Sequence, residues 1–230
     1  YGDALDPIGM VISAIDDTQN ARDLFQKTLD VRRELAKGGG DLERYAFIAT
    51  LHNRAIIDVH LGNLREADSL GTEAVEASRR AMNDSSWMMK AMAPQLLISS
   101  LLYSADTHVC LGLFEQAEKE LAEAATLARA NASGINHEHV RELHLSILSD
   151  QGSLQLVLGR PANALPFFTE ADALGDSTPE ANAAILAKFF PDSRWDLLRV
   201  EALIALGRTK EARKALDAAP EHPDAPDTGQ

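Results

Sequence analysis

Four segments of the sequence align with one another without gaps, at a nearly constant spacing. Each contains Leu-Gly, an alanine five residues after the glycine, and a second alanine seven residues later. The four glycines are Gly62, Gly112, Gly159 and Gly207, which are separated by 50, 47 and 48 residues. A fainter fifth copy places Asp16 where the others have glycine. A repeat of this length indicates a chain built from stacked copies of one structural unit.

The repeating unit has the pattern of two helices joined by a tight turn. Before the glycines the apolar residues recur at three- and four-residue steps, as Ile48, Leu51, Ala55 and Val59 do, which indicates a helix. Glycine can then adopt the left-handed conformation that commonly ends a helix. The two alanines lie two turns apart on the second helix, where their small side chains allow another helix to approach closely. The sequence therefore predicts an all-α fold of stacked helical hairpins.

The Leu-Gly-x4-Ala-x6-Ala frame resembles the tetratricopeptide repeat (TPR), in which the glycine marks the turn between two helices and both alanines lie at helix contacts. That family also has a small residue seven positions before the turn. Ala55, Ala105 and Gly152 supply it here, whereas Val200 is larger. The resemblance covers residues 7–219 and implies a right-handed TPR-like α-solenoid with repeats of about 48 residues.

The repeats depart from the standard TPR in length, because they exceed its 34 residues by 13 to 16, and no proline closes each one. In length they resemble the sensor superhelices of bacterial transcriptional regulators of the maltose-activator type, and the peptide-pheromone receptors of Gram-positive bacteria. This narrower resemblance implies that the chain is the sensor or interaction part of a regulator.

Helix caps and breakers predict one superhelical domain, residues 1–219, followed by a tail. The tail, 220–230, is acidic and rich in proline, and we expect it to be disordered. A short first helix is expected over 7–15 and an extra helix over 178–190. The domain is predicted to hold an incomplete repeat, 7–37, and the four repeats 41–82, 86–131, 136–174 and 179–219.

Charge and cysteine content narrow the function classes. The chain has 22 Lys and Arg against 35 Asp and Glu, a formal net charge of −13. This charge disfavours direct binding of nucleic acid or an anionic membrane, and it favours a basic partner. The single cysteine, Cys110, lies in an apolar run, where we expect a buried thiol. The N-terminal apolar stretch lacks the basic residues of a signal peptide. We therefore expect a cytoplasmic chain without a membrane span, and its start at Tyr1 suggests a processed product or a domain of a longer protein.

No sequence motif points to catalysis. The chain has no G-x4-G-K-[ST] phosphate loop and no G-x-S-x-G nucleophile elbow. The one metal-like cluster, His137 with Glu138, His139, Glu142 and His144, does not bring its ligands to one helix face. We interpret it as a solvated helix surface. We expect no enzyme, no metal and no cofactor, and an enzyme that uses this cluster is the least favoured alternative.

The TPR resemblance implies that the first helix of each pair lines a concave groove. Offsets of −13, −10, −9 and −6 from the turn glycine fall on one helical stripe. The predicted ligand-binding residues are His52, Asn53, Ile56, Tyr103, Asp106, Ser149, Asp150, Ser153 and Arg194. In the family, asparagine at the position of Asn53 commonly holds the backbone of a bound peptide. The family's basic clamp for acidic peptides is not matched, because only Arg194 is cationic on the stripe. The alternative is an ordinary solvated helix surface.

The sequence thus predicts a non-enzymatic module that binds a peptide, a protein or a small-molecule effector in this groove. We expect this chain to come from a bacterial cytoplasmic regulator, from which a DNA-binding or nucleotide-binding part has been removed. The alternative is a stand-alone adaptor that scaffolds two proteins.

Overall fold

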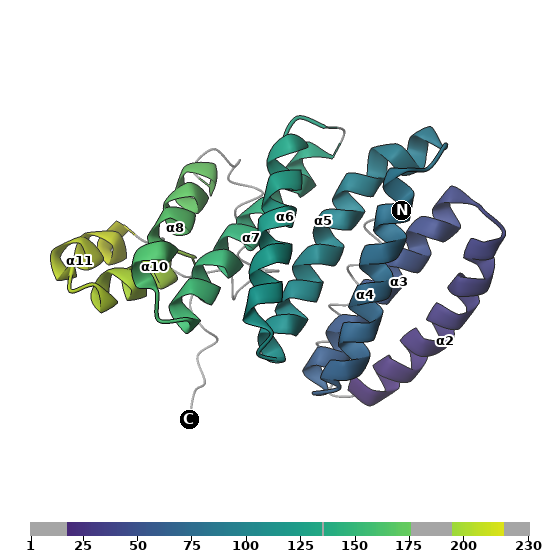
Figure 1. Ribbon diagram of the computed structural model, residues 1–230, viewed down its shortest axis with the longest axis horizontal. Coiled ribbons are helices and arrows are strands. Elements are labelled where there is room, and N and C mark those ends of the chain that lie inside the picture. Colours follow the sequence, from purple (N-terminus) through teal and green to yellow (C-terminus); the bar gives the residue numbers. More distant parts are fainter. Residues whose placement is uncertain (1–17, 135, 176–194, 219–230) are drawn as a thin grey trace, which may run out of the picture. The chain divides into compact units, whose positions relative to one another are not determined.

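The computed structural model describes residues 18–134, 136–175 and 195–218, and these residues form helices without a strand. The predicted helices over 7–15 and 178–190, and the predicted tail 220–230, lie outside the described residues. In chain order the helices are α2 (Thr18–Lys37), α3 (Asp41–His60), α4 (Leu64–Met82), α5 (Trp87–Cys110), α6 (Phe114–Ala130), α7 (His137–Val157), α8 (Pro161–Gly175), α10 (Trp195–Ala205) and α11 (Thr209–Ala218) (Figure 1).

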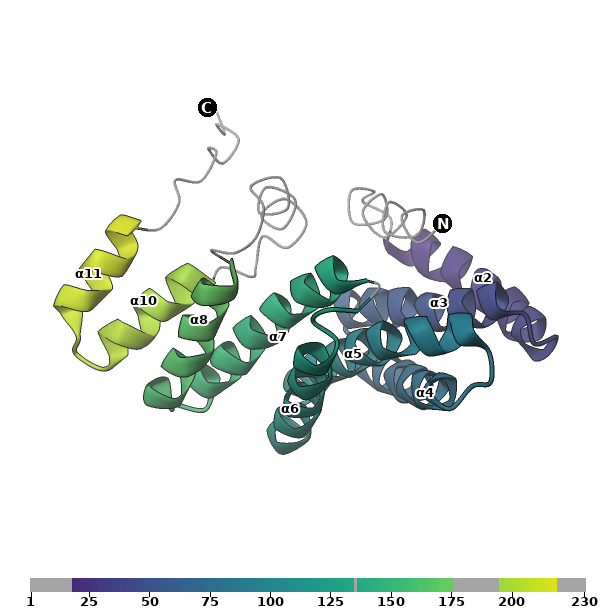
Figure 2. The same cartoon turned by 90° about the horizontal axis from the view of Figure 1, so that it is seen from above.

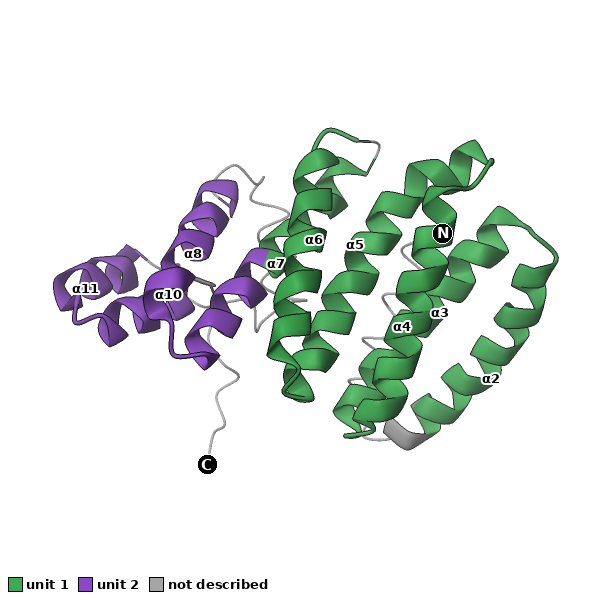
Figure 3. Ribbon diagram, in the orientation of Figure 1, with its two compact units in different colours: residues 1–147 green, residues 148–230 purple. Residues whose placement is uncertain are grey.

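The chain divides into two compact units, residues 1–147 and 148–230, and the division falls inside α7 (Figure 3). In the first unit the hairpins are α3 with α4 and α5 with α6, and α2 packs against α3. The first helices α3 and α5 lie on one side of this unit, and α4 and α6 lie on the other (Figure 2). The domain and repeat boundaries given above stay a prediction.

The four aligned glycines form the turns between paired helices, as the sequence predicts. Gly62, Gly112, Gly159 and Gly207 have φ between 69° and 75°, the left-handed region in which only glycine is unstrained. At the first turn the Gly62 N–H donates to the Val59 carbonyl (2.9 Å) and the Asn63 N–H donates to the Asp58 carbonyl (2.8 Å). The same two bonds recur at the other three turns. Each first helix therefore ends in a Schellman motif that satisfies its last carbonyls.

The small residues lie at the helix contacts where the repeat pattern places them. The described alanines at offsets +5 and +12 are all buried: Ala67, Ala74, Ala117, Ala124, Ala164, Ala171 and Ala212. Ala74 packs with Leu29 of α2 and Leu51 of α3 in one apolar cluster. In the second unit Ala164 packs with Phe168 and with Ala202 of α10. These contacts bury the apolar face of each hairpin against its neighbour.

Successive hairpins stack in a fixed register, which the sequence did not reveal. Offset −4 of a first helix contacts offset +6 of the preceding second helix. In the first unit Asp58 Oδ1 accepts from Arg22 Nε at 2.9 Å, and His108 Nε2 lies 3.0 Å from Asp68 Oδ1. In the second unit the equivalent pair, Leu203 and Leu165, belongs to one apolar cluster. Arg22 stands six residues after Asp16, so this register also supports the fainter fifth copy.

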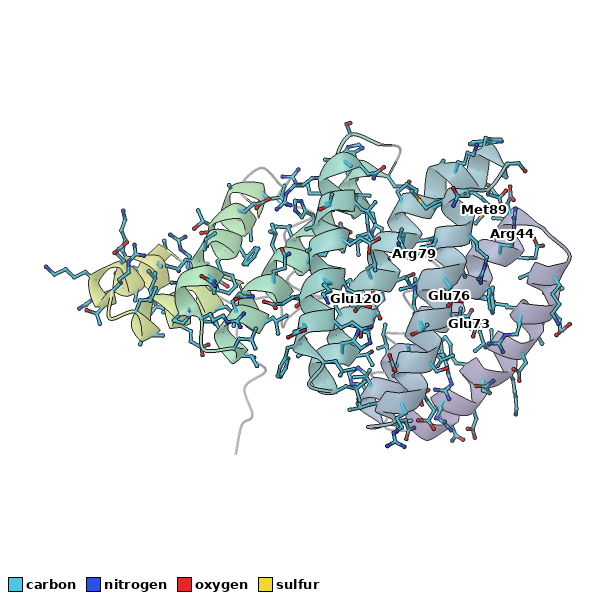
Figure 4. The ribbon with its side chains drawn as sticks, in the orientation of Figure 1. Arg44, Glu73, Glu76, Arg79, Met89 and Glu120 are labelled. Atoms are coloured by element: carbon cyan, nitrogen blue, oxygen red, sulfur yellow. The ribbon has the colours of Figure 1, made fainter. Side chains whose placement is uncertain are left out.

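A second register pair links neighbouring second helices. Arg33 of α2 contacts Glu73 of α4, and Arg79 of α4 contacts Glu123 of α6, each with N···O of 2.7 Å. Both pairs join offset +17 of one repeat to offset +11 of the next. Figure 4 shows Glu73 and Arg79 along α4. Because these side chains are partly solvated, each pair contributes little stability, on the order of 0–1 kcal/mol.

One local expectation is wrong. Cys110 is exposed rather than buried, because its offset of −2 lies on the accessible side of α5. The N-cap of α3 is Gly40, which has no side-chain cap, and Asp41 is the first helical residue.

Candidate functional site

The accessible side of the first helices is a narrow stripe at offsets −13, −9, −6 and −2, which we call the first-helix stripe. At 100° per residue these positions span only about 60° of the helix circumference. In the first unit the stripe comprises Ala49, Asn53, Ile56 and His60 on α3 and Ser99, Tyr103, Asp106 and Cys110 on α5. All of these are half-buried or exposed except Ser99.

Six of the nine predicted ligand-binding residues lie on the first-helix stripe. Asn53 and Ile56 on α3, with Tyr103 and Asp106 on α5, keep accessible surface in the first unit. In the second unit Asp150 and Ser153 are half-buried on α7. The last member of the predicted set, Arg194, lies outside the described residues.

His52 and Ser149 are buried, and the prediction that they line an open groove is therefore wrong. Their exposed fractions are 7% and 2%. Both stand at offset −10, about 40° beyond the edge of the stripe, and His52 there faces the next hairpin. Its Nε2 lies 2.7 Å from Ser100 Oγ on α5.

The contact of His52 belongs to a buried hydrogen-bond network between α3, α4 and α5. The Ser100 hydroxyl donates to the Leu96 carbonyl at 2.7 Å, so its oxygen is left to accept from His52 Nε2 and from the Ser78 hydroxyl at 2.9 Å. Burial lowers the pKa of His52 to about 4, because desolvation penalises the imidazolium form. His52 is therefore neutral at physiological pH.

The same histidine ring supports Tyr103 on the first-helix stripe. The two ring centroids are 5.6 Å apart, with an angle of 52° between the planes, a tilted arrangement favoured for aromatic pairs. Tyr103 itself is half-buried. The packing of α3 on α5 thus holds the position of an accessible aromatic side chain.

Asp106, on the first-helix stripe of α5, has a clearly shifted pKa. The pKa of Asp106 is raised to about 7 by desolvation. The side chain keeps access to solvent, yet the surrounding protein displaces enough water to disfavour its charged form. Within the described part of the chain, no hydrogen bond or ion pair joins Asp106 to another residue.

Asn53 is a second polar side chain without a hydrogen-bond partner among the described residues. It is half-buried on α3, and its amide makes no hydrogen bond to another described residue. A free amide can donate and accept at once, as the backbone of an extended peptide requires. Asn53 and Tyr103 occupy the same offset, −9, on helices that pack against each other.

Sequence reasoning missed the buried charged groups inside the first unit. Asp58 is fully buried and accepts from Arg54, from Arg22, and from Asn63 Nδ2 at 3.1 Å. His108 is 2% exposed, and its Nδ1 lies 2.6 Å from Glu120 Oε2. These groups tie helices together and do not face solvent. Their signal was a polar residue at offset −4 of an otherwise apolar helix face.

The described residues show no arrangement suited to a metal. No group of three or more His, Cys, Asp or Glu side chains in the described ranges could hold an ion. Within the predicted cluster His137 is exposed whereas His144 is buried. None of the described helices has the length and hydropathy to cross a membrane.

Comparison with known proteins places the fold but not the family. The sequence matches no protein-family model and no curated protein. Two crystal structures of a kinesin light chain candidate from Podosopora anserina with nearly identical TPR-like repeats are similar to this chain, with TM-scores of 0.65 and 0.64 and 15% identity. The match covers 94% of this chain and 91% of that one. BtubC (BKLC) from P. vanneervenii gives a TM-score of 0.54 at 14% identity, over 94% of this chain and 98% of that one. The helical hairpins, their glycine turns and these structural matches together show that the chain has the all-α fold of the TPR-like repeat proteins.

Proposed function

We propose that this protein is a non-enzymatic interaction module that binds an extended segment of a partner protein on the first-helix stripe. The observation that carries the proposal is a pair of polar side chains, on adjacent helices, that have no partner in the part of the chain that the structure describes. Asn53 on α3 and Asp106 on α5 are both accessible, and neither is bonded to another residue in the described ranges.

The chemistry of the stripe fits a peptide better than a small apolar ligand. Peptide backbones need donors and acceptors at regular intervals, and an amide, a carboxylate and an aromatic ring offer these together with contact area. The net charge of −13 favours a basic partner. The same charge argues against nucleic acid as the partner.

For the biological setting we favour the sensor or interaction domain of a bacterial cytoplasmic regulator, on the basis of repeat length. A stand-alone adaptor that scaffolds two proteins is the alternative. A DNA-binding or nucleotide-binding segment encoded beside this one would favour the regulator, and its absence from the full gene would favour the adaptor. A small-molecule effector in place of a peptide would use the same stripe.

The proposal is tested by panning a phage-displayed library of random dodecapeptides on the purified protein. We expect selected peptides to bind the wild type and to lose binding to the double variant Asn53→Ala, Tyr103→Ala. The matched control, Thr72→Ala with Thr126→Ala, changes two exposed residues of the second helices and should bind as the wild type does. Failure to select any peptide, or equal binding by the stripe variant, would contradict the proposal.

A further inference from the structure

We propose that Asp106 and Tyr103 form a subsite for an arginine side chain of the bound segment, a specificity that rests on the proposed function. The carboxylate would accept from the guanidinium, and the Tyr103 ring would contact its planar face. The subsite requires an arginine in the bound segment, whereas the proposed function requires only that the segment is extended.

The first observation is the contrast between Asp106 and the carboxylates that bind basic side chains inside the first unit. Asp58 is bound by Arg54 and Arg22, and Glu73 is paired with Arg33. Asp41 and Asp84 both contact Arg44, while Asp68 and Glu120 flank His108. Asp106 has no such partner among the described residues. Asp106 is the carboxylate of the first-helix stripe in the first unit, and its side chain is accessible there.

The second observation is the aromatic ring one turn away. Tyr103 and Asp106 stand at positions i and i+3 of α5, and side chains three residues apart on a helix are neighbours. Because His52 packs against Tyr103, the ring position is held before a ligand arrives. His52 is neutral, so it adds no positive charge that would repel an incoming cation.

A guanidinium matches both groups better than an ammonium does. It is planar, it can donate two parallel hydrogen bonds to one carboxylate, and it stacks on aromatic faces. Ile56 occupies the offset of Asp106 on the neighbouring helix α3 and is half-buried. An accessible apolar side chain there can contact the methylene groups of an arginine.

The surroundings of Asp106 make a cationic partner favourable. Desolvation raises the pKa of the Asp106 carboxyl group. Water therefore stabilises the ionised form of Asp106 less than it stabilises an ordinary surface carboxylate. A bound guanidinium would stabilise the charged form directly. Groups with strongly shifted pKa values are concentrated at functional sites.

The test uses N-acetyl-arginine amide and N-acetyl-citrulline amide, which have nearly the same shape but differ in charge. Each probe is titrated into the 15N-labelled protein, and amide shifts of residues on α3 and α5 are followed by NMR. We expect arginine amide to bind at least about tenfold more tightly than citrulline amide, as a charge-assisted hydrogen bond implies. Asp106→Asn should abolish the difference between the two probes.

The matched control is Asp217→Asn, which removes the same charge from an exposed position on α11. This variant should keep the preference for arginine, which separates a local subsite from the general attraction of an acidic protein for cations. Equal binding of both probes to the wild type, or an arginine preference that survives Asp106→Asn, would overturn the subsite. Asp106→Asn removes an unfavourable charge, so we expect it to fold, and circular dichroism checks this.

The test of the arginine subsite can fail or succeed independently of the test of the proposed function. Selected peptides that depend on Asn53 and Tyr103 but bind Asp106→Asn as well as the wild type would leave the interaction module standing and reject the arginine subsite. An arginine preference that depends on Asp106, in a protein that selects no peptide, would support the subsite and reject a peptide as its ligand.

Discussion

The ring of Phe168 on α8 occupies the space that a side chain at Gly152 on α7 would need. A Cβ at position 152 would lie 2.2 Å from Phe168 Cε1 and 2.4 Å from its Cζ. Phe168 is fully buried and packs against Ala164 and Ala202. Gly152, at offset −7, is therefore required for the placement of Phe168, the largest fully buried side chain among the described residues of the second unit.

This contact predicts a pair of compensating substitutions. Gly152→Ala should lower the free energy of unfolding by about 1–3 kcal/mol, because the added methyl overpacks the contact with Phe168. Phe168→Leu in the same chain should recover part of the loss, so that the double variant costs less than the two single changes together. Urea unfolding followed by circular dichroism measures all three. Additive costs would show that residues 152 and 168 do not share this space.

Gly112 and Gly71 should respond in opposite directions to alanine. Gly112 has φ of 74°, with open space where a Cβ would lie, so Gly112→Ala introduces backbone strain of about 1–2 kcal/mol. Gly71 lies inside α4, where a Cβ would meet Ser104 atoms at 3.6 to 3.7 Å, an ordinary contact. Gly71→Ala should stabilise the helix by about 0.5–1 kcal/mol. The melting temperatures should move down for the first and up for the second; the same sign for both would refute the turn conformation.

Removal of Asp58 should be among the most damaging changes in the first unit. Asp58→Ala leaves the buried Arg54 guanidinium without its partner, and breaking a buried ion pair in this way costs about 3–5 kcal/mol. Replacing Arg54 and Asp58 together by leucine should cost less, because no charge is then left buried. Glu76→Ala, which removes an exposed surface pair with Arg80, is the control and should cost less than about 1 kcal/mol. A similar loss for Asp58→Ala and Glu76→Ala would contradict the burial of this pair.

His52 should make the protein sensitive to mild acid. Its pKa is about 4 in the folded protein, against an ordinary value of 6.5, so the unfolded chain binds the proton more readily. The resulting stability is fully present above pH 6.5 and is lost as the pH falls through 4. The loss is of order 3 kcal/mol, from about 1.4 kcal/mol for each pKa unit. His52→Gln should flatten the decline of the urea midpoint between pH 7 and pH 4, and an unchanged decline would show that His52 is not the group responsible.

Asp106 should act in the opposite sense. Its pKa of about 7 in the folded protein lies above the ordinary 3.8, so the folded state holds its proton more tightly than the unfolded state does. That contribution to stability is fully present below pH 3.8 and is lost as the pH rises through 7. Asp106→Asn should therefore raise the urea midpoint relative to wild type at pH 8 and change it little at pH 3.5. An equal effect at both pH values would contradict the raised pKa, and Asp217→Asn serves as the control.

The helical hairpins were predictable because their determinants are local. Gly62 and its three equivalents specify a left-handed turn without help from distant residues. An alanine such as Ala117 allows a close helix contact whichever helix packs against it. The register between hairpins was not predictable, because Asp58 and Arg22 are joined only by packing across 36 residues. A single polar residue on an apolar face does not reveal which distant side chain satisfies it.

The site was predicted in part for a geometric reason. Offset −10 lies only about 40° beyond the edge of the accessible stripe, and the sequence alone does not show that the boundary between buried and accessible positions falls between them. His52 is buried against the next hairpin whereas Asn53 is half-buried. Only the angle at which α5 packs on α3 makes this distinction. The residue that could have indicated the burial of His52 is Ser100, which lies in an apolar run of α5 and is the hydrogen-bond partner of His52.

The changing chemistry at the −4/+6 register has a consequence for folding fidelity. Chains of similar repeats are prone to docking between the wrong copies, because their apolar faces are interchangeable. Here one junction holds Asp58 on Arg22, the next holds His108 against Asp68, and a third is apolar. If α5 docked in the place of α3, His108 would meet Arg22, and the buried Asp58 would lose one of its two arginine partners. The two charged junctions therefore disfavour the wrong neighbour, and part of the order of the hairpins is encoded in buried charge as well as in chain connectivity.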